Sequence, residues 1–175
     1  MNPFDQCKSR NDTYPTISDT IKNYKLVKFL GEGAYGCVYK VEDTKDIGKT
    51  YALKIINKLI MDDDKNILDR FQLEIKYMKL INNDNVIKVF DNWNDGNNYY
   101  MIINYCDNGD LEMHLREKGR FQENDAIYYL KQISCGIKAY LKYNIIHRDL
   151  KVENIFVHKD TAIVGDFGLL KAEST

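Results

Sequence analysis

Hydrophobic positions in the first hundred residues follow a strand-like pattern. Five short runs are rich in aromatic and branched side chains, and glycine-containing or polar segments separate them. These runs are residues 24–30, 37–41, 51–56, 86–90 and 99–103. The last two flank a polar loop with the turn sequence Asn94-Asp95-Gly96. We therefore predict an antiparallel sheet. Residues 1–22 show neither strand nor helix periodicity and are predicted to form a tail.

The apolar spacing lengthens to that of a helix between residues 62 and 82. Its apolar positions are Ile67, Phe71, Ile75 and Met78. This segment lies between the third and fourth predicted strands. The sequence therefore predicts one helix within the sheet region.

Helical patterns dominate after a short polar connector, residues 104–110. Residues 111–118 predict a short helix that ends at Gly119, and Asn124 or Asp125 is expected to cap a longer one. The apolar stripe of the longer helix is Ile127, Leu130, Ile133, Ile137 and Leu141. Short strands are predicted at 155–157 and 162–164. The expected parts are a tail (1–22), a sheet lobe (23–103), the connector and a helical lobe (111–175), which is an α+β organisation.

Composition narrows the class of protein. A hydrophobic content of 44% with a net charge of −1 is typical of a soluble globular protein and gives no electrostatic reason to expect nucleic acid or membrane partners. The cysteines, at positions 7, 37, 106 and 135, lack zinc-site spacing and are expected to be free thiols. Without an apolar leader or a long apolar run, we expect the protein in the cytoplasm or the nucleus.

The glycine-rich segment between the first two strands has the spacing Gly31-x-Gly33-x-x-Gly36-x-Val38. Glycines at similar spacing also open the strand-to-helix turn of dinucleotide-binding domains, but a strand follows them here. The pattern therefore favours a hairpin flap whose main-chain amides lie over phosphate groups. An ordinary glycine-rich hairpin is the alternative.

Lys54, on the third strand, could place its ammonium group on the same phosphates if an acid holds it in position. Glu74, on the predicted helix, is the candidate. Asp69 and the run from Asp62 to Asp64 are rival acids, but they lie nearer the helix start, where negative charge suits the helix dipole. A solvated lysine at a sheet edge is the alternative interpretation.

The densest group of chemical residues follows the long helix. The sequence from His147 to Asn154 is His-Arg-Asp-Leu-Lys-Val-Glu-Asn, and Asp166-Phe167-Gly168 comes shortly after it. Asp149 is the candidate base for a substrate hydroxyl, and Lys151 could neutralise charge on a transferred phosphoryl group. Asn154 and Asp166 offer oxygen ligands, which Mg²⁺ prefers. A polar turn with an unrelated strand-end aspartate is the alternative.

With these motifs in this order, the chain from about Tyr24 to Lys171 resembles the eukaryotic protein kinase family. The resemblance implies a two-lobed α+β fold, with a complete sheet lobe and the first part of a helical lobe. It implies ATP and Mg²⁺ as ligands and a protein serine or threonine hydroxyl as substrate, because Lys151 follows Asp149 at the serine/threonine-class spacing. No nucleic acid or membrane partner is expected, and a regulatory protein partner stays open.

The resemblance also assigns the nucleotide site. The implied contacts are Gly31, Gly33 and Gly36 as the flap, Val38 and Ala52 above the adenine, Phe156 below it, the Lys54–Glu74 ion pair, Ile103 as gatekeeper, the main chain of Asn104 and Cys106 at the adenine edge, and Asp110 near the ribose.

The sequence ends seven residues after Gly168, before the family's Ala-Pro-Glu motif. Two functions are therefore expected: a serine/threonine kinase domain present in truncated form, or an inactive nucleotide-binding or regulatory fragment. We also expect the sheet lobe to fold more readily than the helical lobe, because part of the long helix's apolar stripe would be exposed.

Overall fold

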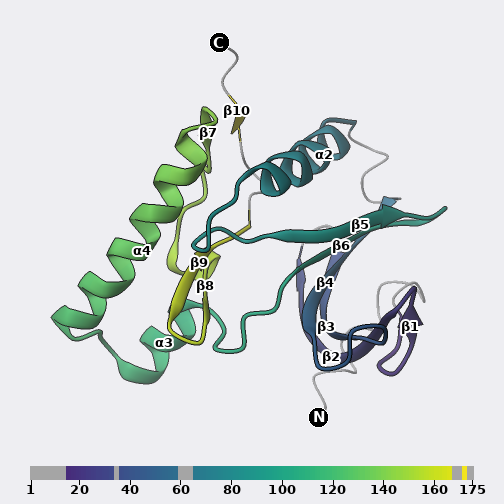
Figure 1. Cartoon of the computed structure of the whole chain (residues 1–175), viewed down its shortest axis with the longest axis horizontal. Helices are drawn as coiled ribbons and strands as arrows, with labels where there is room; N and C mark the ends of the chain where they lie inside the picture. Colours follow the sequence, from purple (N-terminus) through teal and green to yellow (C-terminus); the bar gives the residue numbers. More distant parts are fainter. Residues whose placement is uncertain (1–14, 34–35, 59–64, 167–170, 173–175) are drawn as a thin grey trace.

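Six strands form a curled antiparallel sheet on one side of the molecule (Figure 1). The structure is a computed structural model and describes residues 15–33, 36–58, 65–166 and 171–172. The strands of this sheet are β1 (Thr20–Ile21), β2 (Tyr24–Gly33), β3 (Gly36–Asp43), β4 (Thr50–Asn57), β5 (Val89–Asn94) and β6 (Asn98–Asn104). Their spatial order is β1-β2-β3-β4-β6-β5, so β4 and β6 lie inside the sheet.

Side chains from β2 and β5, which are not neighbours in the sheet, meet across the curl. The ring of Trp93 on β5 stacks on Tyr24 of β2 and on Tyr100 of β6, with centroid distances of 5.9 and 5.0 Å. The Lys22 ammonium lies 3.4 Å from the Asp91 carboxylate. Leucine, isoleucine and valine side chains fill the space inside the curl and form a core within the sheet lobe.

Helix α2 (Lys65–Leu80) packs against this sheet. The rings of Phe71 and Tyr99 lie 5.6 Å apart, and Phe71, Ile75 and Met78 are buried, which confirms these three positions of the predicted apolar face. The segment after α2 then reaches the other lobe, because the Ile87 amide donates to the Val164 carbonyl at 2.9 Å.

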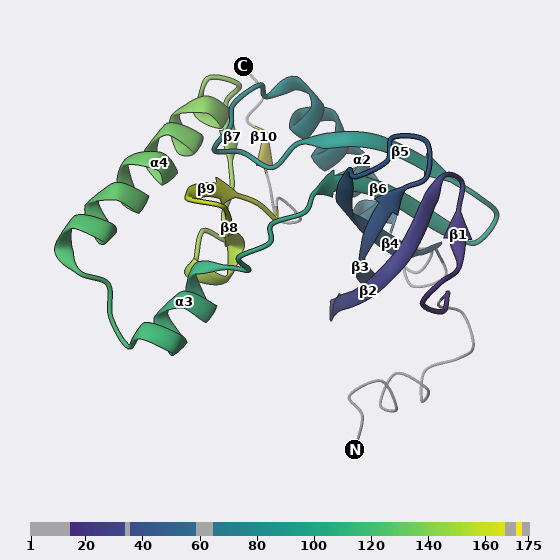
Figure 2. The same ribbon diagram turned by 60° about the horizontal axis from the view of Figure 1, so that its bottom comes forward.

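In the described residues, the second lobe contains two α-helices, one 3₁₀ helix and four short strands (Figure 2). The elements are α3 (Leu111–Lys118), α4 (Glu123–Leu141), β7 (Ile145–Ile146), the 3₁₀ helix η2 (Val152–Asn154), β8 (Ile155–His158), β9 (Thr161–Val164) and β10 (Lys171–Ala172). Strands β8 and β9 pair as a hairpin beside α4, and β10 pairs with β7. The α+β architecture with two lobes is therefore confirmed, while the boundaries assigned to the tail and connector stay predictions.

Local sequence signals placed α3 correctly. Asp110 caps its start, and Gly119 ends it with φ of 74° and an amide that donates to the Leu115 carbonyl at 2.8 Å. The start of α4 was predicted wrongly. The N-cap is Gln122, whose side chain makes no capping hydrogen bond, so the helix begins before Asn124 and Asp125.

One strand prediction needs correction, and one short strand was not predicted. The strand predicted at 86–90 begins at Val89 (β5), because Val86 forms a parallel bridge with Val164 and is buried there instead of entering the sheet. Residues 20–21, inside the predicted tail, form β1 through pairing with Tyr24 and Lys25. Both differences come from tertiary partners, which local patterns do not report.

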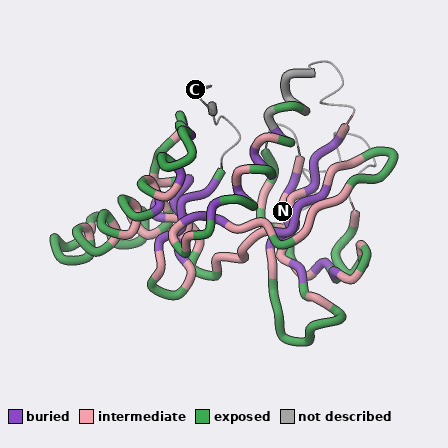
Figure 3. The backbone as a smooth tube through the Cα atoms, turned by 45° about the horizontal axis from the view of Figure 1, so that its top comes forward, coloured by how far each residue is buried: buried purple, intermediate pink, exposed green. Residues whose placement is uncertain are grey.

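Helix α4 is buried on one side only (Figure 3). Gly136 and Tyr140 are buried, whereas Leu130 is 60% exposed and Ile127 and Leu141 are 41% and 49% exposed. The apolar stripe thus extends beyond the part that the β8–β9 hairpin covers. In the residues that the structure describes, no helix is both long and apolar enough to span a membrane.

Candidate active site

The glycine flap is the hairpin between β2 and β3, where Gly33 pairs with Gly36. A side chain at Gly36 would collide with the Ile55 carbonyl of β4, so close approach of two strands requires glycine here. Among the described residues, no atom lies within 4 Å of where a side chain at Gly31 would begin, and at Gly33 the nearest atom is 4.0 Å away. These two glycines therefore leave open space beside the main chain. The flap tip, residues 34–35, lies outside the described residues.

Three charged side chains from three elements meet between the lobes. The Lys54 ammonium on β4 lies 3.7 Å from the Glu74 carboxylate on α2 and 3.9 Å from the Asp166 carboxylate after β9. Among the acids considered for Lys54, the structure thus places Glu74 at contact distance, whereas Asp69 is exposed and Asp62 to Asp64 lie outside the described residues. The structure therefore brings the predicted pair, Lys54 and Glu74, together, and Asp166 is a third member of the group.

Burial sets the electrostatics of this group. Burial raises the pKa of Glu74, and the Lys54 ammonium opposes that shift only in part. Burial alone would lower the pKa of Lys54, but the carboxylates of Glu74 and Asp166 outweigh it and the pKa is raised. Lys54 is therefore a cation at neutral pH, placed between the carboxyl groups of Glu74 and Asp166.

The loop from His147 to Asn154 is held by its own side chains. The Asn154 side-chain amide donates to the Asp149 carbonyl at 2.8 Å and to its carboxylate at 2.9 Å. His147 is buried, and its Nδ1 accepts from the Asp149 amide at 3.3 Å. Nε2 therefore carries the proton and donates to the Gly165 carbonyl, 2.8 Å away. These contacts fix Asp149 relative to the segment that carries Asp166.

Lys151 lies against the candidate base. Its ammonium is 3.1 Å from the Asp149 carboxylate. The hydrogen bond from Lys151, assisted by the Asn154 amide, lowers the pKa of Asp149, and the same contact raises the pKa of Lys151. Asp149 is consequently ionised at neutral pH and able to accept a proton.

Asn154 and Asp166 offer the donor atoms that a Mg²⁺ ion takes. The Asn154 amide nitrogen is committed to Asp149, so its Oδ1 is the atom available to a cation. Half of the Asp166 side chain is exposed, and its backbone has a left-handed φ of 56°. Across the described residues, no group of three or more His, Cys, Asp or Glu side chains is placed to hold a metal ion. The two oxygen donors fit an ion that fills its remaining positions with phosphate oxygens and water.

Three of the residues assigned to the adenine pocket lie on adjoining strands of the sheet. Ala52 on β4 pairs with Ile103 on β6, and Val38 on β3 pairs with Lys54. Phe156, on β8 of the other lobe, has its ring beside Gly165. The structure thus places Val38, Ala52 and Ile103 on neighbouring strands of the sheet lobe and Phe156 in the other lobe, and the roles of these residues stay predictions.

Asp110 does something that the sequence interpretation missed. Its carboxylate accepts the Met113 amide at 2.8 Å and so caps α3, and the residue forms an isolated bridge with Phe156. The capping oxygen is therefore engaged within the protein. The signal was present in the sequence, since aspartate directly before a helix is a common cap.

Three tertiary contacts around the connector had no sequence signal. The Lys88 amide donates to the Asn104 side chain at 2.6 Å, Asp107 pairs with His158 at 2.9 Å, and the Lys40 ammonium lies 4.7 Å from the Tyr105 ring centroid. Burial, with a smaller effect of Asp107, raises the pKa of Cys106 to about 12, so this thiol is protonated at neutral pH.

Comparison with known proteins agrees with this geometry. The family model described as protein kinase domain matches residues 24–175. Calcium-dependent protein kinase 4 of Plasmodium falciparum is 35% identical over 96% of this chain and 33% of its own length. Aurora kinase of Yarrowia lipolytica is 35% identical over 85% of the chain and 40% of its own length. Serine/threonine-protein kinase atg1 of Dictyostelium discoideum is 29% identical over 86% of the chain and 24% of its own length. The chain thus spans well under half the length of these curated relatives.

Proposed function

The chain belongs to the protein kinase family, and we propose that it binds ATP with Mg²⁺ and transfers the γ-phosphoryl group to a serine or threonine hydroxyl of a protein. The observation that carries this proposal is the meeting of Lys54, Glu74 and Asp166 between the lobes. It brings one side chain from β4, one from α2 and one from the segment after β9 into a single group, as the proposed phosphate and Mg²⁺ contacts require.

Each charged residue has a part in the proposed transfer. Asp149 orients the substrate hydroxyl and accepts its proton as the oxygen–phosphorus bond forms and the bond between the β and γ phosphates breaks, which releases ADP. Lys151, 3.1 Å from Asp149, neutralises charge on the transferred group. Lys54 binds the remaining phosphates. A bound Mg²⁺, held by Asn154 and Asp166, would supply charge neutralisation at the phosphate oxygens.

The second candidate is a nucleotide-binding module that engages a regulatory partner without phosphoryl transfer. The exposed apolar side of α4 favours it, because apolar side chains at this density on a surface often mark a contact with another protein. Both candidates share ATP binding and differ in the chemical step.

Two measurements separate the candidates. Calorimetric titration with Mg²⁺·ATP should show binding by the chain and by Asp149→Asn, and binding at least about tenfold weaker by Lys54→Met, since a charge-assisted contact to phosphate is lost. Radiolabel from γ-labelled ATP should enter a generic basic protein with the chain and not with Asp149→Asn. Failure to bind ATP would overturn both candidates, and ATP binding without transfer would select the second.

A further inference from the structure

The side chain of Asn104 extends the sheet where the connector begins. Asn104 is the last residue of β6 and pairs with Tyr51 on β4. Its Oδ1 accepts the main-chain amide of Lys88 at 2.6 Å. Val89 and Ile103 form the last pair of the β5–β6 ladder, so the side chain adds a contact one residue beyond the main-chain pairing.

The pairing of β5 with β6 is irregular at this end, so the extra hydrogen bond helps to hold the two strands together. A bulge at Phe90 shifts the register between Val89 and Asp91. Without the Asn104 side chain, the start of β5 would contact β6 only through the pair next to that bulge. The hydrogen bond thus holds the end of β6 between β4 on one side and the start of β5 on the other.

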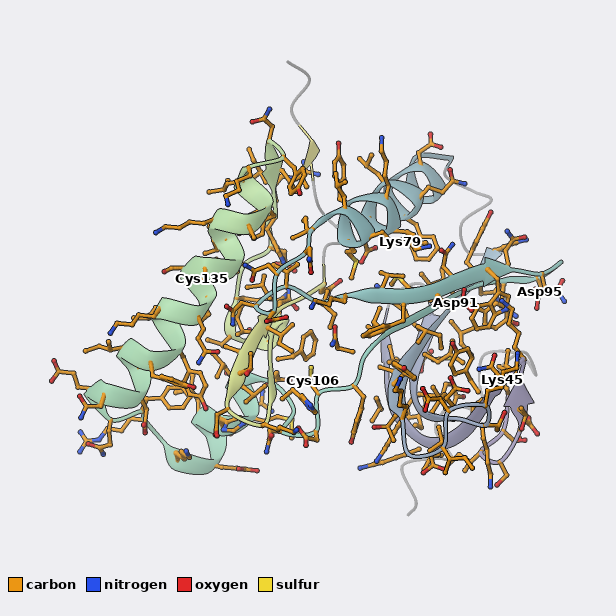
Figure 4. All side chains as sticks on the ribbon, in the orientation of Figure 1. Lys45, Lys79, Asp91, Asp95, Cys106 and Cys135 are labelled. Atoms are coloured by element: carbon orange, nitrogen blue, oxygen red, sulfur yellow. The ribbon has the colours of Figure 1, made fainter. Side chains whose placement is uncertain are left out.

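The connector beyond Asn104 is anchored at its far end as well. The Asn108 amide donates to the Val157 carbonyl at 3.1 Å, and the Val157 amide donates to the Gly109 carbonyl at 2.8 Å. Between these anchors, the main chain of Tyr105 and Cys106 crosses from one lobe to the other, as Figure 4 shows at the labelled Cys106. The direction in which this main chain presents its amides and carbonyls therefore depends on the two anchors.

We propose that the Asn104 side chain is a positioning residue for the base of the nucleotide. Its hydrogen bond to Lys88 orients the peptide that leads into the connector, so that the connector main chain is already arranged to bind the adenine edge. A connector released from this anchor would be ordered only on binding, and the lost conformational freedom lowers affinity. The inference rests on the proposed function, in which that main chain meets the base.

The hydrogen bond between Asn104 and Lys88 is expected to affect binding of the adenine base and not binding of the phosphates. Lys54, Glu74 and Asp166 lie on β4, α2 and the segment after β9, and the ion pairs of Lys54 are with the other two and not with the connector. Adenosine, which has the base and lacks the phosphates, should therefore lose as large a factor in affinity as ATP when the anchor is removed.

The test compares variants of the full chain by calorimetric titration with Mg²⁺·ATP and with adenosine. Asn104→Leu is close in size and lacks the acceptor, and Asn104→Asp keeps it. The leucine variant should bind both ligands about three- to tenfold more weakly, the typical effect of one such hydrogen bond, and the aspartate variant should bind within about twofold of the original chain. If the leucine variant does not fold, Asn104→Ala takes its place.

Asp95→Ala is the control for a general loss of stability. The Asp95 carboxylate accepts the amides of Asn97 and Asn98 at 2.8 and 2.7 Å in the same β5–β6 hairpin, at the end far from Cys106 (Figure 4). This variant should lower the melting temperature and leave both affinities unchanged. Equal affinities of the leucine variant and the original chain, or an equal loss in Asp95→Ala, would overturn the inference alone. If the original chain did not bind ATP, both the inference and the proposed function would be overturned.

Discussion

Two pairs of opposite charge in the site differ in their surroundings. Glu74 is buried, so water screens its interaction with Lys54 only weakly, and removal of the Lys54 charge would leave a buried carboxyl group without its partner. Asp149 and Lys151 lie at the surface, where water weakens their attraction. At the residue scale, the first pair therefore fixes structure, and the second adjusts how readily a carboxylate holds a proton.

The pKa of Asp149 gives a direct test of that adjustment. The hydrogen bond from Lys151 is the largest cause of its lowered pKa. In a carbon-detected NMR titration, the Asp149 carboxyl should have its midpoint below that of an ordinary aspartate, and Lys151→Met should move the midpoint upward. Because the folded pKa is the lower one, ionised Asp149 adds stability above the unfolded pKa and loses it as the pH falls through the folded pKa.

Lys142→Met is the matched control for this titration, since Lys142 is an exposed lysine just after α4. It should leave the Asp149 midpoint where it is. A midpoint that moves equally in both variants would mean that overall charge, and not the Lys151 contact, lowers the pKa of Asp149.

At the scale of elements, the segment between α2 and β5 joins three parts of the molecule. The Asn85 carbonyl accepts the Val164 amide at 2.9 Å, and the Asn85 side chain donates to the Ala162 carbonyl at 2.9 Å. Helix α4 passes close to this point at Gly136. The segment thus connects the helix that carries Glu74 to the strand that precedes Asp166.

Gly136 is predicted to be required at this crossing. A side chain there would lie 2.5 Å from the Asn85 carbonyl oxygen and 3.0 Å from a Val164 methyl group. Alanine normally favours a helix over glycine by about 1 kcal/mol, yet overpacking against main chain costs about 1–3 kcal/mol. Chemical denaturation should therefore show Gly136→Ala to be less stable than the original chain.

Ser134→Ala, on the exposed side of the same helix, is the control and should change the free energy of unfolding by no more than about 0.5 kcal/mol. A Gly136→Ala variant as stable as Ser134→Ala would show that α4 moves away from Asn85 at little cost.

The elements that sequence patterns predicted well are those with their own local signals. The short helix α3 has aspartate before it and glycine after it, and α2 has three buried apolar residues at helical spacing. The pattern failed at Val86, since an apolar run looks the same whether it enters a sheet or bridges to Val164. In the site, motif order pointed to Lys54 and Glu74, but the Lys88–Asn104 hydrogen bond depends on how two distant segments meet.

At the scale of the whole molecule, the two lobes differ in how far their apolar surface is covered. The inner strands β4 and β6 have hydrogen-bonded neighbours on both sides and buried side chains such as Leu53 and Ile102. Helix α4 has a partner on one side, and Leu130 on its other side is 60% exposed. Local opening costs less free energy where fewer apolar contacts are lost.

Hydrogen exchange measured by mass spectrometry should follow this difference. In a sample shown to be monomeric by sedimentation, peptides covering β4 and β6 should exchange most slowly, and peptides covering residues 123–131 of α4 should exchange faster. The monomer check matters because self-association through Leu130 and Ile127 would cover the helix and slow its exchange. Protection that is uniform from Ile127 to Leu141 in the monomer, and as high as in β4, would show that one-sided packing is sufficient to hold α4 as firmly as the sheet.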